Sequence, residues 1–92
     1  MSVTRLNEFQ AAKGKGQALY DFLKSLIPYI QNSNGCLSCE VLRNQENPDV
    51  FIVIEKWENI ESHKKSVENF PKEDMHSAMS LFGGPPKGDY YA

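Results

Sequence analysis

Two histidines are the side chains of this sequence best suited to acid–base chemistry, because imidazole titrates near neutral pH. His63 lies in a lysine-rich segment, and His76 lies among Met75, Met79 and Phe82. Either histidine could act as a general base, and His76 could border an apolar pocket. The simpler interpretation of each is a surface histidine, and the sequence leaves both interpretations open.

Several other residues could position a substrate. Trp57 offers an indole N–H donor on a large ring, although core packing is its simpler role. Asn7 lies within a predicted strand, where amides are disfavoured, and it shares a strand face with Arg5 and Phe9. Glu55 shares the face of Trp57, and a structural hydrogen bond or salt bridge is its simplest role. We expect the substrate-binding residues to be Asn7, Phe9, Trp57 and Phe82.

The cysteines Cys36 and Cys39 have the Cys-x-x-Cys spacing of redox and zinc sites. Thioredoxin-like chemistry needs this pair at a strand-to-helix turn, and a zinc site needs a second pair. Here both cysteines lie within a predicted strand, where an odd separation sends side chains to opposite faces. We therefore expect neither a redox pair nor a metal site.

The elements that carry these residues follow from the apolar periodicity. Strands are predicted over residues 3–9, 36–43, 50–57 and 87–92. Helices are predicted over residues 17–31, 60–69 and 72–82. Pro28 should kink the first helix or end it one turn early, and Asn34 or Gly35 should adopt the left-handed conformation of a helix end. Asn59 should cap the second helix, and Met75, Met79 and Phe82 should share one side of the third.

This order is βαββαβ, with the two later helices in one crossover. It predicts the α+β class with a ferredoxin-like antiparallel sheet and helices on one face. The 92 residues allow one domain, which we expect to span residues 1–92.

Charge and hydropathy exclude several classes of function. The net charge of −2, with no basic cluster denser than Lys64-Lys65, argues against nucleic-acid binding. No apolar run has the length of a membrane span, so no membrane association is expected. The first residues lack the pattern of a signal peptide, which predicts a cytoplasmic location.

The third predicted strand is apolar on both of its faces. Phe51-Ile52-Val53-Ile54 does not alternate as a strand of a one-sided sheet would. Helices can cover one face only, so we expect a second subunit to cover the other. The pattern therefore predicts a homodimer.

Short motifs in this order resemble the antibiotic biosynthesis monooxygenase family. They are Gly35-Cys36-Leu37-Ser38-Cys39-Glu40-Val41, Asn47-Pro48-Asp49, Glu55-Lys56-Trp57-Glu58, the following His63, and Gly84-Pro85-Pro86. Family members typically show Gly-Cys-Leu-x-Tyr-Glu, an Asp-Pro-type hairpin turn, Glu-x-Trp and a helix that contains histidine. Cys39 stands at the family's tyrosine. The family's histidine often lies at the position of Ser66, one turn beyond His63, so the register of this helix stays open.

The resemblance implies a dimeric α+β barrel, in which two sheets pack face to face. It also implies a monooxygenase that needs no cofactor and oxidises a small aromatic, phenolic or quinol-like compound with O2. His63 or His76 would be the base, and Asn7 and Trp57 would position the substrate. Related barrels suggest two alternatives. One is a haem-binding or haem-degrading protein with Asn7 in the pocket and His76 as axial ligand. The other is a non-catalytic stress-response module that binds a small ligand.

Overall fold

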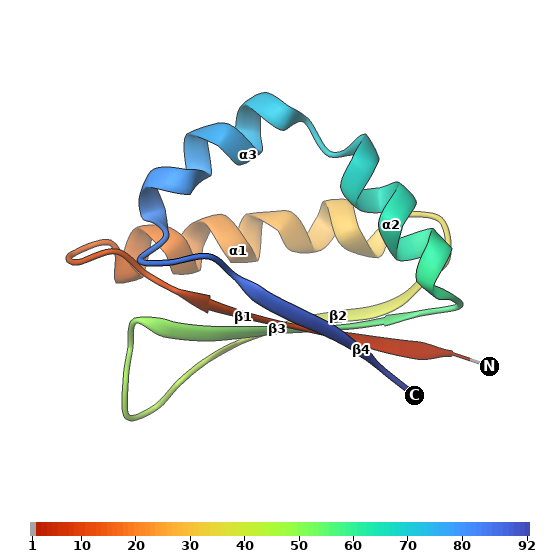
Figure 1. The fold of residues 1–92 in the computed structure, drawn as a ribbon, viewed down its shortest axis with the longest axis horizontal. Helices are drawn as coiled ribbons and strands as arrows, with labels where there is room; N and C mark the ends of the chain where they lie inside the picture. Colours follow the sequence, from red (N-terminus) through yellow and green to blue (C-terminus); the bar gives the residue numbers. More distant parts are fainter. Residues whose placement is uncertain (1) are drawn as a thin grey trace.

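The computed structural model describes residues 2–92 and contains four strands, three α-helices and one 3-10 turn. In chain order they are β1 (Val3–Gln10), α1 (Gly16–Gln31), β2 (Cys36–Arg43), β3 (Val50–Trp57), α2 (Ile60–Asn69), α3 (Lys72–Ala78), η1 (Met79–Leu81) and β4 (Lys87–Tyr91). This is the predicted ferredoxin-like layout (Figure 1).

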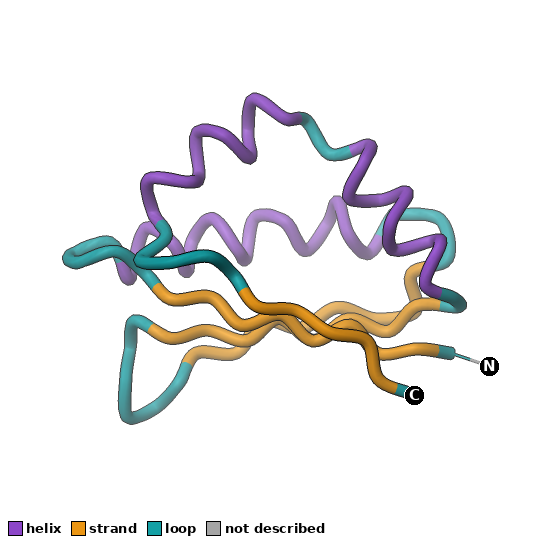
Figure 2. Tube along the Cα trace, viewed as in Figure 1, coloured by secondary structure: helices purple, strands orange, loops and turns teal. Residues whose placement is uncertain are grey.

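The strands form one antiparallel sheet in the order β2-β3-β1-β4. All the helices lie on the same side of this sheet (Figures 1 and 2). We call that side the helix-covered face and the other the open face. Alternation along β3 places Phe51, Val53, Glu55 and Trp57 on the helix-covered face, where all four are buried.

The apolar core lies between α1 and the sheet. Leu19 and Leu23 of α1 are almost fully buried and pack with Phe51 and Val53 of β3. The helix continues through Pro28 to Gln31, so the predicted early end is wrong. Pro28 removes only one hydrogen-bond donor in an exposed part of the last turns, which the helix tolerates.

Two positions near the later helices decide how the chain turns. Gly35 adopts a positive φ of 89°, which confirms the predicted end of α1. The Asn59 side chain accepts a hydrogen bond of 2.8 Å from the backbone N–H of Ser62, which confirms the predicted cap of α2. The prediction that Phe82 shares a helical side with Met75 and Met79 is wrong. Helical geometry ends at Leu81, and the Phe82 backbone is extended.

A bulge in β2 corrects the prediction for the two cysteines. Cys36 pairs with Trp57 and Cys39 pairs with Glu55, with a register shift between Cys36 and Ser38. The extra residue reverses the alternation, so both cysteines lie on the helix-covered face. The expectation that they point to opposite faces is therefore wrong.

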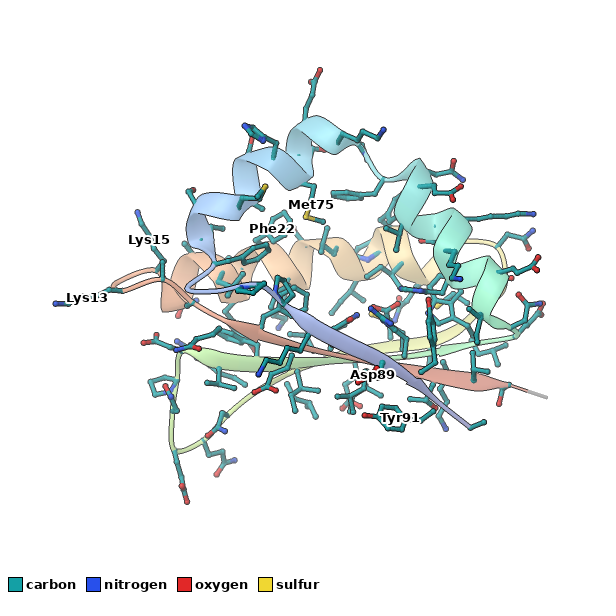
Figure 3. The ribbon with its side chains drawn as sticks, viewed as in Figure 1. Lys13, Lys15, Phe22, Met75, Asp89 and Tyr91 are labelled. Carbon is teal, nitrogen blue, oxygen red and sulfur yellow. The ribbon has the colours of Figure 1, made fainter. Side chains whose placement is uncertain are left out.

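The open face carries apolar side chains from all four strands. Ile52 and Ile54 of β3 lie there with Leu6, Leu42 and Tyr91. Figure 3 shows Tyr91 on the side of the sheet away from the helices. Nothing in residues 2–92 packs over this face. Across the same described range, no helix has the length and hydropathy needed to traverse a lipid bilayer.

Candidate functional site

Four side chains form a row across the helix-covered face, one from each strand. Cys39 lies opposite Glu55, Glu55 lies opposite Arg5, and Arg5 lies opposite Tyr90. The apolar core occupies one end of this face, and the row occupies the other. Strand pairing therefore places a carboxylate, a guanidinium and a phenol next to one another under the helices.

Glu55 is held by the indole of Trp57. The Trp57 Nε1–H donates to Glu55 Oε1 at 2.9 Å, and both side chains are buried. Burial raises the pKa of Glu55, whereas this hydrogen bond and the nearby charge of Arg5 oppose the rise. The bond fixes the carboxyl group, and the same oxygen, Oε1, faces α2.

His63 of α2 completes the group from above the sheet. Its Nδ1 lies 2.6 Å from the Tyr90 hydroxyl, and its Nε2 lies 3.9 Å from Glu55 Oε1. Its ring meets the rings of Trp57 and Tyr90 edge-on, at centroid distances of 5.5 and 5.3 Å. We call Arg5, Asn7, Glu55, Trp57, His63 and Tyr90 the polar cluster.

The imidazole of His63 is neutral at neutral pH. Burial, followed by the charges of Arg5 and Lys64, lowers its pKa to about 4. A proton on Nε2 faces the Glu55 carboxyl group, which leaves Nδ1 to accept the Tyr90 hydroxyl proton. Glu55, His63 and Tyr90 therefore form an array in which Tyr90 can pass its proton to His63 and accept another from a substrate.

The Arg5 guanidinium lies over the Tyr90 ring, beside this array. Its Nε donates to Asn7 Oδ1 at 3.0 Å, and its guanidinium carbon lies 4.6 Å from the centroid of the Tyr90 ring. A Cβ atom at Gly88 would overlap the ends of both the Arg5 and the Asn7 side chains. Glycine at this position of β4 thus leaves the space that the guanidinium occupies.

The two cysteines are unreactive at neutral pH. Burial, with the nearby charge of Glu55, raises the pKa of Cys39 to about 12 and also raises the pKa of Cys36. A protonated thiol is a poor nucleophile and a poor metal ligand. Among residues 2–92, no three His, Cys, Asp or Glu side chains are grouped to hold a metal ion.

The structure brings together only some of the predicted site residues. His63, Asn7 and Trp57 lie in the polar cluster, although the Trp57 N–H is committed to Glu55. Phe9 and Phe82 pack on each other beside the core, with ring centroids 5.6 Å apart. Their part in substrate binding stays a prediction.

His76 is exposed on α3 and contacts none of the polar cluster. Its predicted roles as a base and as a haem ligand stay predictions that nothing in its surroundings favours. Both candidate positions for the family's histidine, His63 and Ser66, are buried in α2. His63 contacts Tyr90, whereas Ser66 lies one turn further along, where its hydroxyl meets that of Ser33 at 2.9 Å.

Sequence reasoning missed Arg5 and Tyr90 as site residues and took Glu55 for a structural group. A carboxylate on the same strand face as Phe51, Val53 and Trp57, which are all apolar, was a signal for Glu55. For Tyr90 the sequence offered little indication, because its place beside Arg5 depends on the pairing of β4 with β1.

Two grooves lie away from the polar cluster. One, of about 640 Å³, separates the end of α1 from α2 and is lined by Tyr29, Ser62 and Lys65 among others. The other, of about 490 Å³, lies between α1 and α3 and is lined by Phe22 and Leu81 among others. No residue of the polar cluster lines either groove. The candidate site is therefore defined by the contacts between its side chains and not by a groove.

The family model described as antibiotic biosynthesis monooxygenase matches residues 2–78, which include most of the polar cluster. The chain belongs to this family. No functionally curated protein matches the sequence.

Solved structures of the same fold include PA3566 from Pseudomonas aeruginosa, with a TM-score of 0.88 and 20% identity over 98% of this chain and 91% of that one. A conserved protein from Methanosarcina mazei Go1 has a TM-score of 0.87 and 21% identity over 99% and 91% of the two chains. A variant of SnoaB, described as a cofactor-independent oxygenase from Streptomyces nogalater, has a TM-score of 0.84 and 12% identity over 99% and 91%. The TM-scores show that these proteins share the fold of this chain. The family membership supports a monooxygenase-like role.

Proposed function

We propose that this member of the antibiotic biosynthesis monooxygenase family oxidises a small phenolic or quinol-like aromatic compound with O2 and without a cofactor. The observation that carries the proposal is the array of Glu55, His63 and Tyr90, in which Glu55 and His63 are buried and Tyr90, at the end that would meet the substrate, is half-buried. The description of SnoaB as a cofactor-independent oxygenase supports the same reaction class for this fold.

The first step is removal of a proton from the substrate. The substrate hydroxyl, which for anthrone is that of its enol form, donates to the Tyr90 oxygen while Tyr90 donates its own proton to Nδ1 of His63. The imidazolium that forms lies beside the Glu55 carboxyl group, whose Oε1 is 3.9 Å from Nε2. Glu55 thus stabilises the charged His63, and the Trp57 N–H keeps the carboxyl group in place.

The second step is electron transfer from the substrate anion to O2. An electron-rich anion gives one electron, and the resulting radical pair combines to a peroxide at the reacting carbon. Loss of water from the peroxide leaves a carbonyl. For an anthrone-like substrate, the ring methylene and one molecule of O2 become a carbonyl group and one molecule of water, and the substrate supplies all four electrons. The protein's part is proton transfer, positioning and exclusion of water.

We propose further that the working unit is a homodimer formed through the open face. Ile52 and Ile54 lie on this face together with Leu42 and Tyr91, which are 44% and 54% exposed in the single subunit. A second copy that packs its own sheet there would bury these side chains. It would also supply the cover that the apolar pattern of β3 predicts.

Oxygen consumption by metal-free protein tests the proposed reaction. The substrates are a panel of hydroquinones and anthrone. We expect uptake above the buffer background by the wild-type protein, and a loss of roughly a hundred-fold or more in the His63→Ala protein. Glu68→Ala changes an exposed residue of the same helix and is the matched control.

Two results would contradict the proposal. One is the same uptake by the wild-type and His63→Ala proteins. The other is a loss of uptake in the His76→Ala protein but not in His63→Ala, which would assign the base to the other histidine.

A further inference from the structure

We infer that Arg5 binds the ionised oxygen of the substrate, so that the protein selects acidic phenols and enols and holds them as anions. This inference rests on the proposed function, because it concerns the same site. It adds a charged recognition element to the array that removes the proton. Three observations support it: the terminal nitrogens of Arg5 have no protein partner among residues 2–92, the rest of its guanidinium is held in place, and it lies beside Tyr90.

Arg5 has no carboxylate partner in the described part of the chain. Glu55 lies directly opposite it in the pairing of β1 with β3, yet the two side chains form no ion pair within 4.0 Å. The Glu55 oxygen points instead to Trp57 and His63. The charge of Glu55 is near enough to interact with Arg5, but the terminal nitrogens of Arg5 bond to no carboxylate in this part of the chain, so an anionic ligand can bind to them directly.

The guanidinium is also fixed before any ligand arrives. Asn7 accepts the hydrogen bond from Nε, the Tyr90 ring stacks against the planar group, and Gly88 leaves space for it. Arg5 is only half-buried, and residues 2–92 contain no buried side-chain nitrogen that lacks a partner. Its two terminal nitrogens therefore keep solvent contact and can donate to an oxygen anion.

Arg43 provides a comparison within the same face. It too lies against aromatic rings, at 5.3 Å from the centroids of both Tyr20 and Phe51. Two of its three nitrogens are occupied, because Nε donates to the Pro48 carbonyl at 2.8 Å and Nη1 donates to Gln17 at 3.3 Å. Arg43, the other arginine of the chain, therefore has a structural role, whereas the terminal nitrogens of Arg5 have no protein partner within the described residues.

Tyr90 links Arg5 to the proton acceptor. The same phenol ring carries the guanidinium on its face and contacts Nδ1 of His63 through its hydroxyl. The low pKa of His63 makes it a weak base, so proton removal needs stabilisation of the anion that forms. A positive charge beside Tyr90 provides this stabilisation.

Binding of 4-nitrophenol without turnover tests the inference, because its visible absorption reports its ionisation. We expect the wild-type protein to bind the phenolate more tightly than 4-nitroanisole, which has no ionisable hydroxyl, and to lower the pKa of the bound phenol. Arg5→Gln should weaken phenolate binding roughly ten- to a hundred-fold. Arg43→Gln, the matched control, removes the same charge from the same face and should bind like wild type.

Three outcomes would overturn the inference: no binding of 4-nitrophenol by the wild-type protein, a preference for 4-nitroanisole, or equal phenolate binding by the Arg5→Gln protein. Near-ultraviolet circular dichroism verifies that Arg5→Gln is folded. If it is not, Arg5→Met replaces it, since methionine keeps an unbranched side chain without the charge, and unchanged phenolate binding would again overturn the inference.

Failure of this inference differs from failure of the proposed function. Oxygen uptake that does not depend on Arg5 would remove the inference alone. Phenolate binding that depends on Arg5 without any oxygen uptake would support the inference and remove the proposed reaction.

Discussion

The pH dependence of stability gives a quantitative test of the environment of His63. The pKa of this residue falls from 6.5 to about 4 on folding, chiefly because of burial. Between these values the unfolded chain binds more protons at His63 than the folded chain does. The free energy of unfolding therefore falls as the pH falls through this window, and the difference in pKa corresponds to about 3 kcal/mol.

The comparison of wild type with His63→Asn isolates this contribution. Glu55 acts in the opposite direction, because its raised pKa favours the folded state at low pH, but it is present in both proteins. Urea unfolding can be followed by the fluorescence of Trp57, the only tryptophan, which is fully buried. The protein concentration is held constant, because association would add to the apparent stability.

We expect the wild-type protein to lose more stability than His63→Asn between pH 6.5 and about 4, by up to about 3 kcal/mol. His76→Asn, which replaces the exposed histidine, should follow the wild-type curve. Parallel curves for wild type and His63→Asn would refute the reasoning, because they would mean that folding does not hinder protonation of His63.

Three further substitutions test separate parts of the structure. Gly88→Ala should displace Arg5 and Asn7 and weaken 4-nitrophenolate binding as Arg5→Gln does; wild-type affinity would count against the placement of the guanidinium. Asn59→Ala removes the cap of α2 and should cost about 1 kcal/mol in urea unfolding, and an unchanged midpoint would show that the cap is dispensable. Ile54→Lys places a charge on the open face and should shift sedimentation toward the monomer, whereas an intact dimer would place the interface elsewhere.

The arrangement of strands and helices could be predicted from local patterns. Alternation and helical spacing depend on neighbouring residues, and they located every element of the fold to within a few residues. The errors arose where tertiary structure overrides local preference. The bulge at Leu37 reverses the alternation of β2, and pairing of Phe82 with the chain at Ala11 draws it out of the helix.

The site was predicted less completely because its contacts join distant parts of the chain. His63 was a candidate by residue type alone, since histidine titrates near neutral pH. Its partner Tyr90 is 27 residues away and meets it only because β4 pairs with β1 and α2 folds over the sheet. Nothing in the local pattern distinguishes Tyr90, on the helix-covered face, from Tyr91, on the open face, before the register is known.

The fate of the oxygen atoms tests the proposed reaction most directly. Metal-free protein is given anthrone under isotopically heavy O2, and the product is examined by mass spectrometry. We predict one heavy oxygen atom in the new carbonyl of the quinone and the other in water, with formation slowed roughly a hundred-fold by Tyr90→Phe. A new carbonyl oxygen that comes from solvent, or an unchanged rate in the Tyr90→Phe protein, would contradict the account.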